Sequence, residues 1–183
     1  MKIRFLISAL ILLSAASGCK KDDESRQFQN WLPGPMTFGK ITAMRDSDVW
    51  KASCYAAESK AGDGFFYFIA GTWDEDGAAK EEIGIEPIPL KTGQFPVKYK
   101  PVALSLDGRC LATFALLDDD LILATYLPDS SFVNYVEVTE YDSLTRVVKG
   151  IFDIHFTAAN EAYKPWPKTV HFSNGAFEAT LQD

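Results

Sequence analysis

From Phe38 onward, apolar and polar residues alternate with a period of two, which is typical of β-strands that have one buried and one solvated face. Residues 148–156 show the alternation most clearly. The side chains on the predicted inward face are Val148, Gly150, Phe152, Ile154 and Phe156. Lys149, Asp153 and His155 lie on the predicted outward face. The same parity predicts inward rows at Ile83 and Ile85, at Val170 and Phe172, and at Phe177, Ala179 and Leu181.

Two further segments, 65–70 and 111–117, are apolar on both faces and are expected to be central strands. Turn residues separate the strands at 61–64, 74–77, 107–108, 118–120, 128–130 and 174–175, where Asn174-Gly175 is the strongest signal for a tight hairpin. Only Thr157–Tyr163 suggests a helical turn. The pattern therefore predicts an all-β fold, an antiparallel β-sandwich or flattened barrel of about nine to eleven strands.

The N-terminus has the pattern of an export signal. Lys2 and Arg4 precede the apolar run Phe5–Ala16, which is shorter than the ~20 residues that a membrane-spanning helix needs. Residues 1–18 are therefore predicted to be a signal peptide, and residues 19–35 a flexible tether that ends near Pro33, Gly34 and Pro35. Residues 36–183 are predicted to form a single domain.

Cys19 follows three small residues, Ala16-Ser17-Gly18, and precedes the polar stretch 20–25. This arrangement resembles a bacterial lipobox, which implies a mature N-terminus at Cys19 with palmitate-type acyl chains that anchor the protein to the membrane. Lys21-Asp22-Asp23 resembles the surface-export signal of Bacteroidota lipoproteins, which implies an outer-membrane, surface-exposed location. In the alternative interpretation, Cys19 is an incidental cysteine beside an ordinary signal peptidase site.

Composition excludes some function classes. Without residues 1–18 the chain has 16 Lys and Arg residues against 25 Asp and Glu residues, a formal net charge of −9. This charge argues against a nucleic-acid partner, which would need a clustered positive surface. An aromatic content of 13% and an apolar content of 47% indicate a folded core rather than a disordered chain.

Four stretches of the domain resemble a family of small Bacteroidota lipoproteins whose domain has no known function. They are Trp50-Lys51-Ala52, Gly93-Gln94-Phe95, residues 150–156 (GIFDIHF) and 174–177 (NGAF). Glycine where strands bend and aromatic residues in the core also explain these positions structurally. The resemblance implies a β fold and a lipid anchor, and it implies no activity.

The two histidines and the acidic clusters are the first candidates for metal-binding or catalytic chemistry. His155 and His171, the only histidines, are each placed on the solvent face of a strand, with no Cys, His or acidic partner at metal-ligand spacing. They are therefore interpreted as surface histidines, and no metal or cofactor is predicted. Residues 74–77 and 118–120 are interpreted as solvated acidic turns rather than calcium ligands. No nucleophile motif or phosphate-binding glycine loop occurs, so no catalytic residue is assigned.

Trp166 lies between two prolines. It is a candidate ligand contact, with a plug over the end of the core as the alternative.

Cys54 and Cys110 occupy strand positions whose alternate neighbours are predicted to face inward, so both side chains are expected in the core. Two separate buried thiols are favoured over a disulfide.

Taken together, these observations favour a lipid-anchored surface lipoprotein with a non-catalytic binding module for glycans or envelope proteins. A glycan hydrolase with a carboxylate site and a structural subunit of a surface assembly are the alternatives.

Overall fold

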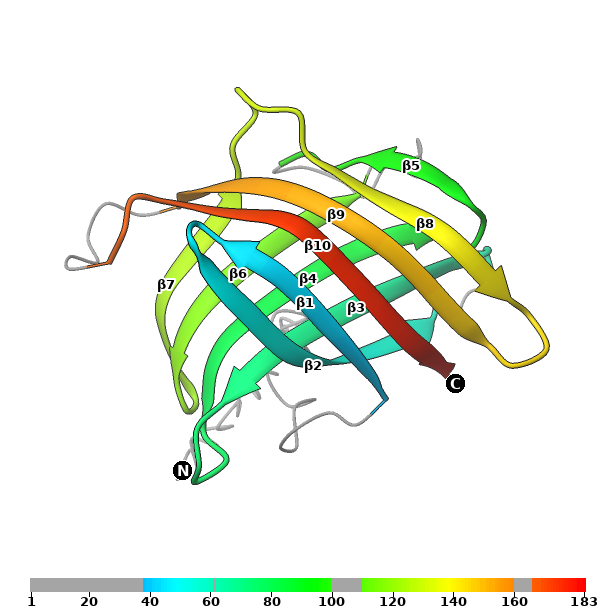
Figure 1. The fold of residues 1–183 in the computed structure, drawn as a ribbon, viewed down its shortest axis with the longest axis horizontal. Helices are drawn as coiled ribbons and strands as arrows, with labels where there is room; N and C mark the ends of the chain where they lie inside the picture. Colours follow the sequence, from blue (N-terminus) through cyan, green and yellow to red (C-terminus); the bar gives the residue numbers. More distant parts are fainter. Residues whose placement is uncertain (1–37, 61, 100–109, 160–165) are drawn as a thin grey trace, which may run out of the picture. The chain divides into compact units, whose positions relative to one another are not determined.

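The alternating segments form ten β-strands in the computed structural model, which describes residues 38–60, 62–99, 110–159 and 166–183 (Figure 1). The strands are β1 (Gly39–Arg45), β2 (Asp48–Glu58), β3 (Phe65–Trp73), β4 (Ala79–Pro89), β5 (Gly93–Pro96), β6 (Leu111–Asp118), β7 (Leu121–Pro128), β8 (Tyr135–Asp142), β9 (Val147–Ala158) and β10 (Thr169–Gln182). None of the described residues is helical. The prediction of an all-β fold with nine to eleven strands is confirmed.

The ten strands belong to one sheet that closes on itself through β10. The hydrogen-bonded order is β1-β10-β2-β3-β4-β6-β7-β9-β8-β5, and β10 also pairs with β9. Strand β10 pairs in parallel with β2 at Leu181 and Gln182, whereas its pairings with β1 and β9 are antiparallel. Figure 1 shows β10 running between β9 and β1. The closed arrangement corresponds to the flattened barrel of the two predicted architectures.

One edge of β9 is shared by two neighbours. Strand β8 pairs with its first part, from Val147 to Asp153, and β7 pairs with its last part, from Phe156 to Ala158. Residues 129–134, which connect β7 to β8, therefore lie beside β9 where it changes partner. His155 lies at this position of β9.

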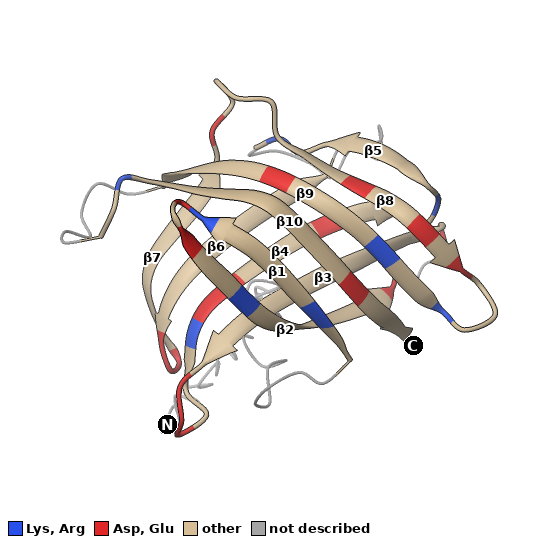
Figure 2. Ribbon diagram, viewed as in Figure 1, with Lys and Arg blue, Asp and Glu red and all other residues tan. Residues whose placement is uncertain are grey.

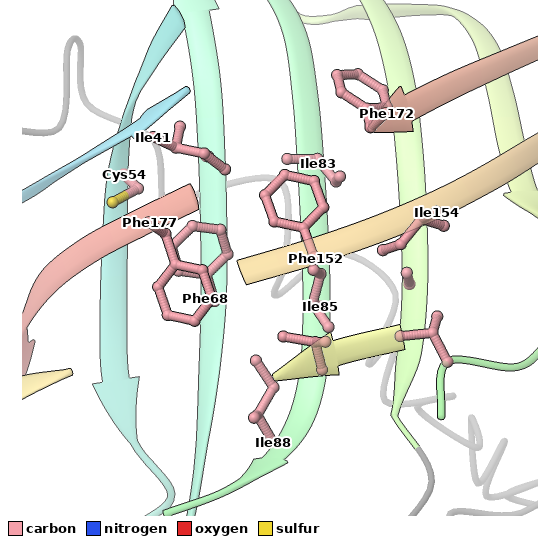
Figure 3. Packing of buried hydrophobic residues seen from close by; sticks show 14 of the residues in the cluster. Ile41, Cys54, Phe68, Ile83, Ile85, Ile88, Phe152, Ile154, Phe172 and Phe177 are labelled. Atoms are coloured by element: carbon pink, nitrogen blue, oxygen red, sulfur yellow. The ribbon is translucent and has the colours of Figure 1, made fainter. Parts of the chain in front are cut away.

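The interior is filled by the side chains that the alternation predicted to face inward. All of the apolar residues in the predicted inward row of 148–156 are at most 1% exposed. Figure 3 shows Phe177 of β10 beside Phe68 of β3, and their ring centroids lie 4.9 Å apart. Aromatic rings from two strands that do not pair with each other thus contact in the interior, so the centre is a packed core.

The predicted hairpin turn at Asn174-Gly175 is wrong, because both residues lie within β10. The register with β9 shifts from Phe172↔Ile154 to Gly175↔Phe152, so β10 carries one extra residue in a β-bulge. Asn174 has a φ of 51°, a left-handed conformation that asparagine tolerates. The bulge switches the inward parity of β10 from even to odd. The inward residues before it are Val170 and Phe172, and those after it are Phe177, Ala179 and Leu181.

The turns at 74–77, 118–120 and 128–130 are confirmed. The helical turn expected at Thr157–Tyr163 is wrong at its start, because Thr157 and Ala158 belong to β9, and residues 160–163 lie outside the described residues, as do 107–108. Cys54 and Cys110 are both buried free thiols, as expected.

Charged residues of both signs are interspersed along the strands seen in Figure 2. On that side of the domain, Lys and Arg do not gather into a single basic patch.

Candidate functional site

The outer face of the ring carries the polar side chains, and two places on it bring chemically useful groups together. The first, called here the histidine site, comprises Asp153, His155, His171 and Phe132. The second, called here the Trp73 groove, lies over β2, β3 and the turn that follows β3.

The histidine site is built on a direct cross-strand pair, His155 of β9 and His171 of β10. The backbone N–H and C=O groups of His155 and His171 form hydrogen bonds with other residues and not with each other. The His155 N–H donates to Asn134 Oδ1 over 2.7 Å, and its carbonyl accepts from the Asp129 N–H over 2.8 Å. The His171 N–H donates to Asp46 Oδ1 over 3.0 Å, and its carbonyl accepts from the Asp46 N–H over 2.7 Å. Such a non-hydrogen-bonded pair is the closest side-chain approach that an antiparallel sheet offers.

The two imidazoles and a phenyl ring form a continuous stack. The rings of His155 and His171 are parallel within 11°, with their centroids 3.6 Å apart. Phe132, from the β7–β8 connection, stacks on His155 at 3.9 Å, also at 11°. His155 is therefore held between an aromatic ring and a second imidazole.

Asp153 adds a carboxylate to the same side of the sheet, because it precedes His155 by two residues on β9. Its Oδ1 atom lies 2.8 Å from His171 Nε2 and 3.9 Å from His155 Nε2. The side chains of Asp153, His155 and His171 are 30%, 26% and 33% exposed. Two imidazole nitrogens and a carboxylate oxygen thus face one another at a place that solvent reaches.

The electrostatics of the site lower the pKa of His155. The larger cause is burial, followed by the neighbouring charge of His171, while Asp153 and Asp129 act in the opposite direction. The neutral form of this imidazole, which has a free nitrogen lone pair, is therefore favoured.

The connection that presents Phe132 is fixed by two polar residues. Asn134 is only 5% exposed, and its Nδ2 donates to the Asp129 carbonyl over 2.8 Å. Asp129 Oδ1 accepts from the Ser131 N–H at 2.9 Å and from Ser131 Oγ at 2.7 Å. The polar atoms of Asn134 thus tie this connection to the backbone of His155, which fixes the stack from one side.

The sequence interpretation of the histidines was incomplete. It placed both correctly on the outward face and treated them as separate residues without an acidic partner. Asp153 and His155 share one face two residues apart, which is visible in the sequence. The third member, His171, joins them through the β9–β10 register, which the sequence does not show.

The Trp73 groove is an open depression of about 430 Å³ on the outer face. Its lining residues come from β2, β3 and the β3–β4 turn: Lys51, Ala52, Ser53, Gly71, Thr72, Trp73, Asp74, Glu75 and Gly77. A Cβ atom at Gly71 would lie 3.0 Å from Cη2 of Trp73. The indole therefore lies against the bare backbone of Gly71, in a position that a larger side chain would obstruct.

The acidic turn beside this groove uses its first carboxylate internally, as the interpretation of a solvated turn expects. Asp74 Oδ1 accepts from the N–H groups of Ala78 at 2.9 Å and Asp76 at 3.1 Å. Its other oxygen pairs with Lys80 at 3.1 Å. The hydrogen bond from Ala78, with help from Lys80 and Asp76, lowers the pKa of Asp74. Glu75 at the tip lines the groove.

Trp166, the predicted ligand contact, is 39% exposed. The segment after it is tied to the ring, because Tyr126 Oη donates to the Pro167 carbonyl over 3.0 Å and the Ala158 N–H donates to the Lys168 carbonyl over 2.9 Å. Trp166 is thus a partly exposed aromatic on an anchored segment. Cys19, the predicted lipidation site, lies outside the described residues.

Comparison with known proteins finds no family model that matches the chain, and no curated protein or solved structure with significant similarity to it. Within the described ranges, no helix has the length and apolar character needed to cross a membrane.

Proposed function

We propose that this chain is a lipid-anchored, surface-facing outer-membrane lipoprotein whose β domain is a non-catalytic module that binds glycans at the Trp73 groove. The observation that carries the proposal is the Trp73 indole lying against Gly71 in an open groove. An exposed aromatic face stacks on the apolar face of a sugar ring, and neighbouring polar groups bond its hydroxyls.

The rim of the groove supplies those polar groups. Ser53 offers a hydroxyl, Lys51 offers an ammonium donor, and Glu75 offers carboxylate acceptors. The volume of about 430 Å³ falls within the range of small-ligand sites. The interior packs aromatic against aromatic, so the outer face is the natural place for a ligand.

The anchor rests on the sequence around Cys19. Residues 19–35, which the sequence predicts to be a tether, separate this cysteine from the β domain. An anchor at Cys19 would place the domain beside the bilayer, where it would meet polysaccharides and envelope proteins.

Glycan binding is tested with Trp73→Ala. We expect this variant to lose at least about 90% of the signal on an array of bacterial and host polysaccharides and to keep its melting temperature, because the indole lies on the outer face. Trp166→Ala is the matched control, since Trp166 is also partly exposed. Unchanged glycan binding by Trp73→Ala would refute the groove, and loss of binding in Trp166→Ala alone would place the ligand at the 166–168 segment.

The anchor is tested with Cys19→Ser. We expect the protein to move from the membrane fraction to the soluble fraction without a change in melting temperature. Mass spectrometry of the native protein should show acyl chains on Cys19. An unmodified Cys19, or membrane retention of the serine variant, would refute the anchor.

A further inference from the structure

We propose that Asp153, His155 and His171 form a binding site for a divalent transition-metal ion of the Zn²⁺ class. Two imidazoles and one carboxylate are a common protein ligand set for this ion. This site is separate from the proposed glycan site, because the histidine site lies on β9 and β10 and the Trp73 groove on β2 and β3.

The distances between the ligand atoms fit such an ion after small adjustments. Zn²⁺ bonds of about 2.0–2.2 Å in tetrahedral geometry place neighbouring ligand atoms roughly 3.3–3.5 Å apart. Asp153 Oδ1 lies 2.8 Å from the Nε2 atom of His171 and 3.9 Å from that of His155, values on either side of this spacing. The three residues each offer one ligand atom, and these atoms lie within 4.8 Å of one another.

The imidazoles have to change orientation when the ion binds. In the stack, the two rings are parallel within 11°, so their in-plane lone pairs run side by side instead of converging on one point. Rotation about the Cβ–Cγ bond of each histidine brings them together, and this torsion has broad wells. Phe132, which covers the far face of His155, is 50% exposed and has room to move outward.

The backbone beneath the ligands stays in place during this rotation. Asp46 and Asn134 hold the backbone N–H groups of His171 and His155, respectively, through side-chain oxygens. The two Cα atoms are fixed in a non-hydrogen-bonded pair, so the ion has to reorient only side chains. This pre-organisation distinguishes the cluster from two histidines that merely share a surface.

The site would leave part of the coordination sphere open. Three protein ligands occupy three positions of a four-coordinate ion, and each of the three side chains is about a quarter to a third exposed. Water or a donor group from a partner would complete the sphere, as in zinc sites that keep an open position.

The experiment is titration calorimetry of the full mature chain with ZnCl₂, with MgCl₂ as a comparison ion. We expect one Zn²⁺ per chain and no binding of Mg²⁺, because Mg²⁺ prefers oxygen ligands. The chain has only two histidines, so NMR spectra of the imidazoles report directly on the ligands. Both ring signals should shift on addition of Zn²⁺ as the stack opens.

Variants separate metal binding from a structural role. We expect His155→Ala, His171→Ala and Asp153→Asn each to weaken Zn²⁺ binding at least tenfold. Glu140→Gln, which changes an exposed carboxylate on β8, is the matched control and should bind normally. Phe132→Ala should keep Zn²⁺ affinity, since it removes a stacking partner and no ligand. Asp153→Asn preserves side-chain size, so it remains informative if a histidine variant fails to fold.

Absence of Zn²⁺ binding at 100-fold molar excess would overturn the proposal. So would 1:1 binding that persists unchanged in the His155→Ala/His171→Ala double variant. A lower melting temperature of the variants together with unaltered Zn²⁺ affinity would show that the stack only supports the β7–β8 connection, which would also overturn it.

Discussion

Trp50 donates its indole N–H to Glu81 Oε2 over 2.6 Å, where the inward-facing rows of β2 and β4 pass from apolar to polar residues. The other carboxylate oxygen of Glu81 pairs with Arg45 of β1. Trp50 is 5% exposed and the Glu81 side chain 16%. One carboxylate thus satisfies a buried donor and an arginine from two different strands, and it links β1, β2 and β4.

Glu81→Ala should lower the free energy of unfolding by about 1–3 kcal/mol in urea titrations, because it leaves the indole N–H and the guanidinium without their acceptor. Glu81→Gln should have a smaller effect, since it keeps an acceptor for Trp50. The control is Lys80→Ala, which removes ion pairs of an exposed side chain and should change stability little. Equal losses for Glu81→Ala and Lys80→Ala would show that the bridge contributes little.

Gly150 lies at a position of β9 where a larger side chain would clash with its neighbours. A Cβ atom there would lie 2.3 Å from the Glu137 carbonyl oxygen and 2.3 Å from Cζ of Phe177. Gly150→Ala should therefore lower the free energy of unfolding by roughly 1–3 kcal/mol through overpacking. Gly84→Ala is the control, since its Cβ would meet only Thr113 Oγ1 at 3.5 Å. Similar melting temperatures for the two variants would contradict this packing argument.

The period-two pattern was sufficient to predict the strands and the inward rows, because burial on one face imposes that pattern locally. The bulge in β10 shows where local information ends. Asn174-Gly175 has the residues of a tight turn, yet β10 continues to pair with β9 on both sides of it. The extra residue of the bulge is visible in the sequence only as the change of parity between Phe172 and Phe177. A tight turn at the same two residues would be consistent with the same change of parity, so the sequence alone does not distinguish a turn from a bulge.

The histidine site required information that a single strand does not hold. Which residue of β10 faces His155 depends on how β9 and β10 align, and long-range pairing sets that register. The Trp73 groove likewise depends on Lys51 of β2 lying near a turn that follows β3. Trp166 was predicted as a ligand contact from its two flanking prolines, whereas no local pattern around Trp73 indicates the groove.

The two buried thiols predict a loss of stability at alkaline pH. Burial raises the pKa of Cys54 and of Cys110 from 9.0 to about 12. The folded state therefore holds these protons more tightly, so the contribution of the two thiols to stability is constant below about pH 9 and falls between pH 9 and 12. Cys54→Ala and Cys110→Ala should lower stability at pH 7 through cavities but show a shallower decline above pH 9. The check is urea unfolding at several pH values.

The same thiols should be protected from reagents in the folded protein. At pH 8 we expect neither thiol to react with a disulfide reagent until the chain unfolds, and then both to react, because the thiolate is the reactive form. Rapid labelling of the native protein would show that the strands open locally around these residues.

Glu82 gives a pH effect of the same direction, at the acidic end of the pH range. It lies on the outward row of β4, between Gly71 of β3 and Ala115 of β6, and burial raises its pKa above the ordinary value of 4.5. Its proton is held more tightly in the folded state, so this residue's contribution is most favourable below pH 4.5 and declines as pH rises through the folded pKa. At pH 7 the buried charge destabilises the fold.

Glu82→Gln should therefore raise the melting temperature at pH 7, because the amide has the same shape without the charge. At pH 4 the gain should disappear, since the wild-type carboxyl is then protonated in the folded state. Thermal unfolding at both pH values measures the difference, with Glu75→Gln in the β3–β4 turn as the control that removes a carboxylate from a solvent-exposed site. A lower melting temperature for Glu82→Gln at pH 7 would mean that the ionised carboxylate makes a net favourable interaction in the fold.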